Sequence, residues 1–101
     1  MRLVVAVIKP GLLESVRQAL ATVQVTRMTV CDVHGYDRDA TTRVSQEVML
    51  EIAVNADFVD QTVRTLGAVL AASGDSGGRV FVMPVVEAVQ LYRGVRGPEA
   101  V

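Results

Sequence analysis

The sequence contains few of the residues on which most catalytic and metal sites depend. Its 101 residues include one histidine, one cysteine and no tryptophan. The cysteine, Cys31, cannot form an internal disulfide, and together with His34 it supplies fewer ligands than a zinc site requires. These two residues lie three positions apart on a predicted strand, so their side chains should point to opposite faces rather than form a nucleophile–base pair. We therefore predict no catalytic residues, no metal ligands and no enzyme activity.

The chain also lacks an excess of charge and a long hydrophobic run. Its formal net charge is -1, 21% of its residues are charged and 50% are hydrophobic. A protein that grips nucleic acid would show a basic excess, and a disordered tail would be less apolar. No apolar run approaches the roughly 20 residues that span a bilayer, and the start of the chain lacks the features of a signal peptide. These absences predict a cytoplasmic protein with no nucleic-acid partner and no direct membrane insertion.

The hydrophobic pattern that is present alternates between strand and helix periods. Short apolar runs bounded by turn residues predict strands, and apolar residues at a spacing of three and four predict helices. Asn55 stands where the cap of the second helix belongs. The predicted strands are 3–8, 28–35, 48–54 and 80–83, with one last strand or strand pair within 85–92; the predicted helices are 12–23 and 58–70; and the predicted irregular segments are 36–46, 73–79 and 93–101.

This order predicts an α+β fold, the ferredoxin-like βαββαβ sandwich, in one domain that covers residues 1–101. In that fold two helices cover one face of an antiparallel sheet. The strands 3–8 and 48–54 are nevertheless apolar at almost every position, which is typical of strands buried on both faces. We therefore expect a second copy of the chain to cover the other face, and hence a homo-oligomer.

The glycine-rich segment 73–79 has two interpretations. Gly74, Gly77 and Gly78 permit positive φ and allow backbone N–H groups to turn toward an anion, and Arg79 follows as a bidentate phosphate ligand. The alternative is a helix C-cap with a tight return to the sheet. Four arginines, Arg79 among them, lie in loops or near strand ends, where either ligand binding or solubility explains their presence. These are Arg38, Arg79, Arg93 and Arg96.

Several segments, taken in order and spacing, resemble the PII signal-transduction proteins. The resemblance covers essentially the whole chain except the central loop. The matching segments are V-I-K-P at 7–10, L-x-x-V-R-x-A-L at 13–20, M-T-V at 28–30, G-Y-x-R at 35–38, L-E-I-A-V at 50–54, D-F-V-D at 57–60, G-G-R-V-F-V at 77–82 and R-G-V-R-G at 93–97.

The resemblance implies a homotrimer that binds an adenine nucleotide, ADP, AMP or ATP, in each cleft between subunits. It further implies control of a partner, commonly a membrane transporter, through a flexible T-loop, here 37–46, with a B-loop at 73–79 and a C-terminal loop at 93–101. The implied nucleotide residues are Thr29 at the adenine pocket, Glu51 facing the cleft, Gly35 and Arg38 at the base of the T-loop, Gly74, Gly77, Gly78 and Arg79 in the B-loop, and Arg93. The implied partner-binding residues are Asp37, Asp39, Thr41, Thr42 and Arg43.

The central loop departs from the family pattern. It is about half the usual length, and no tyrosine lies where some PII proteins are modified. Asp39 and Glu47 stand in place of a glutamine and a lysine that serve 2-oxoglutarate binding in the family. Because two negative charges repel a dianion, we predict no 2-oxoglutarate binding.

The last strand departs as well, since Gln90 and Tyr92 stand where the family has phosphate-binding arginines, and Gly77 stands where it has an aspartate. Each lost charged contact weakens phosphate binding by about 1.5–3 kcal/mol, although Arg93 or Arg96 can replace part of the charge. ADP or AMP is thus as plausible as ATP. Three alternatives remain open: a vestigial nucleotide site with a small anion such as bicarbonate as effector, an enzyme that uses the trimer cleft, and a trimeric CutA-type metal-tolerance protein. Candidate metal ligands for the last are Cys31, His34, Asp37 and Asp39.

Overall fold

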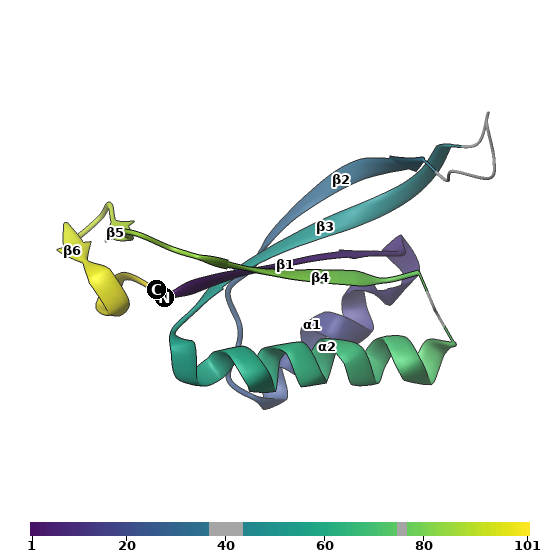
Figure 1. Ribbon diagram of the computed structural model, residues 1–101, viewed down its shortest axis with the longest axis horizontal. Coiled ribbons are helices and arrows are strands. Elements are labelled where there is room, and N and C mark those ends of the chain that lie inside the picture. Colours follow the sequence, from purple (N-terminus) through teal and green to yellow (C-terminus); the bar gives the residue numbers. More distant parts are fainter. Residues whose placement is uncertain (37–43, 75–76) are drawn as a thin grey trace.

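The computed structural model describes residues 1–36, 44–74 and 77–101, and its main feature is a four-stranded antiparallel sheet with both helices on one side (Figure 1). The strand order β2-β3-β1-β4 confirms the predicted ferredoxin-like fold. The elements are β1 (Arg2–Ile8), α1 (Leu13–Thr22), β2 (Thr29–Tyr36), β3 (Val44–Val54), α2 (Val59–Ser73), β4 (Arg79–Pro84), β5 (Val89–Gln90) and β6 (Val95–Arg96), with 3-10 turns η1 (Pro10–Leu12), η2 (Ala56–Phe58) and η3 (Gly97–Ala100).

The hydrophobic core lies between the sheet and the helices. Alternate residues of each central strand point toward the helices, as the period of two requires. The apolar stripes of α1 and α2 meet them, and each fully buried aliphatic side chain contributes about 1.5–3 kcal/mol. The largest buried apolar side chains are Val4, Ile8, Val16, Leu20, Leu50, Ile52 and Leu66. No helix in the described part of the chain is long and apolar enough to cross a membrane.

The opposite face of the sheet is apolar and has no cover within one chain. Leu3, Val5 and Val7 lie at its centre on β1, and register places Phe81 and Met83 beside them on β4. Phe81 is 51% exposed and Met83 42% exposed. A contiguous apolar patch of this kind marks an interaction surface in a protein that stays in solution. The structure thus presents the surface on which the homo-oligomer was predicted.

The loop predicted at residues 36–46 is shorter in the structure, because strands extend into it from both ends. β2 continues to Tyr36 and β3 begins at Val44, with Gly35 paired to Ser45. The pairing of β1 with β3 stops at Ile8 and Val48, so the ends of β2 and β3 form a two-stranded ribbon beyond the sheet (Figure 1). Both faces of such a ribbon lie outside the helix–sheet core, which is why a polar sequence pairs here. The predicted T-loop residues Asp37, Arg38, Asp39, Thr41, Thr42 and Arg43 lie outside the described residues.

The glycine-rich segment is also shorter than predicted, because Ser73 ends α2 and Arg79 begins β4. At the C-terminus, the strand expected within 85–92 is present but short, and the prediction of an irregular tail is wrong. Only Val89–Gln90 is a strand, and it pairs with Val95–Arg96 in a hairpin. The turn closes because the Gly94 N–H donates to the Gln90 carbonyl at 2.8 Å, and Gly94 adopts the positive φ that such a turn requires.

Asn55 occupies the predicted cap position but does not cap with its side chain. It precedes η2 in an extended conformation, yet its side chain makes no cap hydrogen bond. Its Nδ2 instead donates to the Pro98 carbonyl at 3.2 Å, which fastens the C-terminal segment to the start of α2. The buried Oδ1 has no hydrogen-bond partner among the described residues.

Helix α1 ends in a motif that usually contains glycine. The Val25 N–H donates to the Leu20 carbonyl at 2.9 Å and the Gln24 N–H to the Ala21 carbonyl at 3.1 Å, the pattern of a Schellman motif. Gln24 therefore adopts a left-handed conformation, with φ of 65°. A side chain in this region is strained by its Cβ, and glycine is not.

Replacing Gln24 with glycine should relieve this strain. We expect Gln24→Gly to raise the free energy of unfolding by roughly 0.5–1 kcal/mol, measured by urea denaturation at one fixed protein concentration. Gln24→Ala, which removes the same side chain but keeps the Cβ, should give no such gain. Equal stability of the glycine and alanine variants would show that the backbone is not strained.

A charge on the open face should prevent assembly. We expect Phe81→Glu to lower the mass measured by light scattering at micromolar concentration from a multiple of the chain mass to 10.8 kDa. Gln61→Glu, on the exposed side of α2, should leave the mass unchanged, and circular dichroism should show that both variants fold. A wild-type protein of single-chain mass would refute the predicted homo-oligomer.

Candidate binding site

A hollow of about 620 Å³ lies on the open face of the sheet, at the start of β2. Thr29 pairs with Glu51 in register, and both side chains line the hollow. Thr29 is exposed and Glu51 is half-buried. The hollow thus combines a hydroxyl and a carboxylate with apolar walls, as small-ligand sites commonly do. Its other lining residues are Leu3, Thr26, Arg27, Met28, Ala53, Ala100 and Val101.

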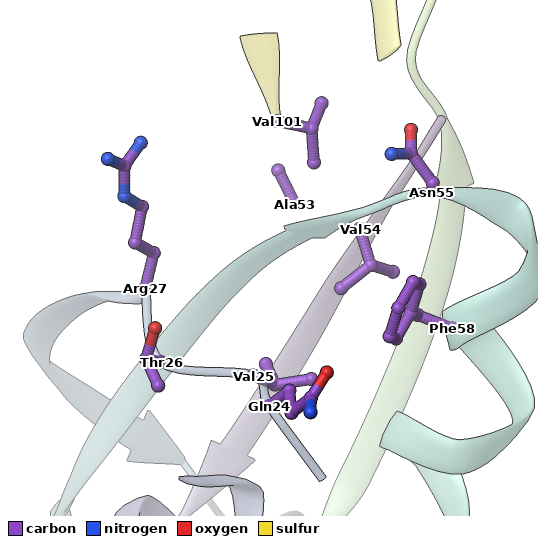
Figure 2. A pocket seen from close by; sticks show the side chains of 9 residues that line it. All are labelled: Gln24, Val25, Thr26, Arg27, Ala53, Val54, Asn55, Phe58 and Val101. Carbon is purple, nitrogen blue, oxygen red and sulfur yellow. The ribbon is translucent and has the colours of Figure 1, made fainter. Parts of the chain in front are cut away.

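A smaller cavity of about 270 Å³ adjoins the hollow and shares Thr26, Arg27, Ala53 and Val101 with it. Figure 2 shows the Arg27 side chain extending away from Phe58 and Gln24, at the edge of this cavity. Arg27 lines the hollow as well. Sequence analysis missed Arg27, because a single arginine before a strand forms no motif.

The glycine-rich turn lies at the other end of the sheet, and two of its glycines have structural reasons to be glycine. Gly74 ends α2 in a left-handed conformation with φ of 74°. A Cβ on Gly78 would lie 2.8 Å from Cδ1 of Leu70, so any larger residue would displace that buried side chain. Of the two interpretations of this segment, the C-cap and tight return therefore hold for Gly74 and Gly78. Anion binding by Gly77, Gly78 and Arg79 stays a prediction.

Thr29 and Arg79 lie on opposite edges of the sheet. Thr29 is on edge strand β2 and Arg79 on edge strand β4, with β3 and β1 between them. Three strand spacings correspond to about 14 Å. A ligand that contacted both within one chain would cross the apolar face. The two predicted parts of the site therefore meet on one ligand only if different copies of the chain contribute them.

At the base of the β2–β3 ribbon, a carboxylate packs against Gly35. The Ser45 hydroxyl donates to Glu47 Oε1 at 3.0 Å and lies 3.4 Å from the Gly35 carbonyl. A Cβ on Gly35 would lie 2.4 Å from Glu47 Oε1, so glycine gives this side chain its room. The negative charge of Glu47 is thereby held beside the predicted T-loop, where a lysine was expected from the family pattern.

The C-terminal hairpin offers little positive charge to a ligand. The Gln90 side chain accepts a hydrogen bond from the Arg93 N–H at 2.8 Å, and this bond stabilises the turn between β5 and β6. Arg96 forms an ion pair with Glu87. Tyr92 is 92% exposed. Neither Arg93 nor Arg96 lines the hollow at Thr29.

The described residues include no group of three or more histidine, cysteine and acidic side chains close enough to hold a metal ion. Cys31 pairs with Met49 on the open face, and His34 pairs with Gln46, at positions of opposite parity on β2. Their side chains thus lie on opposite faces, as predicted. Asp37 and Asp39, the other candidate ligands, lie outside the described residues.

Comparison with known proteins gives a consistent family assignment. The family model described as "Nitrogen regulatory protein P-II" matches residues 1–95. The chain is 28% identical to the nitrogen regulatory protein GlnK1 of Methanosarcina mazei, over 100% of this chain and 97% of that protein. It is 32% identical to the nitrogen regulatory protein P-II of Microchaete diplosiphon, over 100% of both chains.

Among solved structures, the chain resembles Arabidopsis thaliana PII bound to citrate. The TM-score is 0.82 at 29% sequence identity, and the match covers 98% of this chain and 87% of that one. The sequence resemblance is thus confirmed at the level of the family, whose members are regulatory proteins rather than enzymes. This chain belongs to the P-II family of nitrogen regulatory proteins.

Proposed function

We propose that the protein is a homotrimeric sensor that binds an adenine nucleotide in the hollow at Thr29 and Glu51. The observation that carries the proposal is the hollow itself, which is about 620 Å³ in volume and lies on the face that another copy is expected to cover. Glu51 offers an acceptor to the amino group of adenine, and Thr29 offers a hydroxyl. Membership of the PII family supports an adenine nucleotide as the ligand.

The separation of Thr29 from Arg79 supports a site shared between subunits. A contact in which the β4 edge of one copy meets the β2 edge of the next is heterologous, and such contacts form a ring when the rotation between copies closes. Three copies, the number that PII proteins form, would place the glycine turn of one subunit near the hollow of its neighbour. The apolar faces of the three sheets then pack at the centre of the ring.

The β2–β3 ribbon supports an output through residues 37–43. The ribbon extends beyond the sheet, and Tyr36, the last described residue before this segment, is 80% exposed. A nucleotide that binds one arrangement of the segment more tightly shifts the population toward that arrangement. The partner then meets a different surface. A membrane transporter is the partner class that the family resemblance favours.

A thermal-shift panel tests the nucleotide. We expect AMP, ADP or ATP at millimolar concentration to raise the melting temperature, because a ligand that binds only the folded state stabilises it. If none of the three nucleotides changes the melting temperature and bicarbonate raises it, the effector is a small anion rather than a nucleotide. A shift from divalent metals alone would favour metal tolerance instead.

Arg79 should matter for nucleotides with long phosphate chains. We expect Arg79→Ala to weaken ATP binding at least tenfold in calorimetry, because a guanidinium binds phosphate oxygens in pairs. Arg64→Ala, on the exposed side of α2, is the matched control and should bind ATP like the wild type. Unchanged affinity of the Arg79 variant would remove this residue from the site.

The charge of Glu47 should exclude 2-oxoglutarate. We expect calorimetry in the presence of MgATP to detect no binding of this dianion at micromolar concentration, because a carboxylate stands beside the loop that would hold it. The heat of ATP binding in the same cell serves as the positive control. Micromolar affinity for 2-oxoglutarate would contradict the prediction.

A further inference from the structure

The hollow at Thr29 is bordered by a cation as well as an anion. Arg27 and Glu51 both line it. Within residues 1–36, 44–74 and 77–101, neither side chain forms an ion pair. Figure 2 shows the Arg27 side chain extending away from Phe58 and Gln24, at the edge of the smaller cavity. Two residues of opposite charge thus line one hollow, and no ion pair joins them among the described residues.

Such an arrangement favours a ligand with a donor at one end and an anion at the other. A carboxylate accepts hydrogen bonds from an exocyclic amino group, and a guanidinium binds a phosphate through two parallel N–H bonds. Arg27 lies two residues before Thr29, and both line the same hollow. An adenosine monophosphate carries both kinds of group, an exocyclic amino group on its base and a phosphate.

Within one chain the other arginines are poorly placed to hold the first phosphate. Arg79 lies on the opposite edge of the same sheet. Arg96 is paired with Glu87, and neither Arg93 nor Arg96 lines the hollow. Among the described residues, Arg27 is the one arginine that lines the hollow.

We infer that Arg27 holds the first phosphate of the bound adenine nucleotide and gives the site its affinity for AMP, whereas Arg79 contributes mainly to nucleotides with longer phosphate chains. The inference rests on the proposed nucleotide site and deepens it. It also supplies a positive charge at a site where Gln90 and Tyr92 offer none.

Calorimetry with AMP on the full chain tests the inference. We expect Arg27→Ala to weaken AMP binding at least tenfold, and Arg27→Lys, which keeps the charge but loses the planar fork, to weaken it less. Arg64→Ala should bind AMP like the wild type, and Arg79→Ala should weaken AMP binding far less than Arg27→Ala does. Added salt should weaken AMP binding by the wild type more than by Arg27→Ala, because the variant lacks the charge that salt screens.

The outcomes separate the inference from the proposed function. Wild-type affinity for AMP in Arg27→Ala, or loss of AMP binding in Arg79→Ala, overturns the role of Arg27 and leaves the nucleotide site standing. A change of assembly mass in Arg27→Ala assigns the residue to a subunit contact and also overturns the inference. A wild-type protein that binds none of AMP, ADP and ATP refutes the proposed function itself.

Discussion

The uncovered apolar face of the sheet is the constraint on which the rest of the molecule depends. Both helices pack on one side, so no helix covers Leu3, Val5 and Val7 on the other, where their neighbours Phe81 and Met83 stay exposed. Water cannot hydrate such a surface favourably, and another copy of the chain is the simplest cover. The same face carries the hollow at Thr29 along one edge and Arg79 along the other. The proposed assembly and the proposed ligand site therefore share one surface.

Much of the fold was predictable from hydrophobic periodicity, because burial sets that period. The apolar runs at 3–8 and 48–54 and the helical spacing at 12–23 all correspond to observed elements. The errors lie where burial does not decide the structure. The start of β3, residues 44–47, is mostly polar and still pairs with β2. The C-terminal hairpin is held by a glycine turn rather than by a core.

The candidate site was predictable only in part. The family pattern indicated Thr29 and Glu51, and register places them side by side around one hollow. Arg27 carried no pattern, since its relevance arises from three-dimensional proximity to Glu51. The glycines gave an ambiguous signal, because Gly78 is required by the packing of Leu70 whether or not it also approaches a phosphate.

The outer half of the β2–β3 ribbon is attached to the rest of the described sheet at one end only. Beyond the pairing of Ile8 with Val48 it has no third strand beside it, so its outer half is stiffened by its own ladder alone. A change in the direction of its outer pairs, Gly35 with Ser45 and Tyr36 with Val44, would therefore disturb no contact of the helix–sheet core.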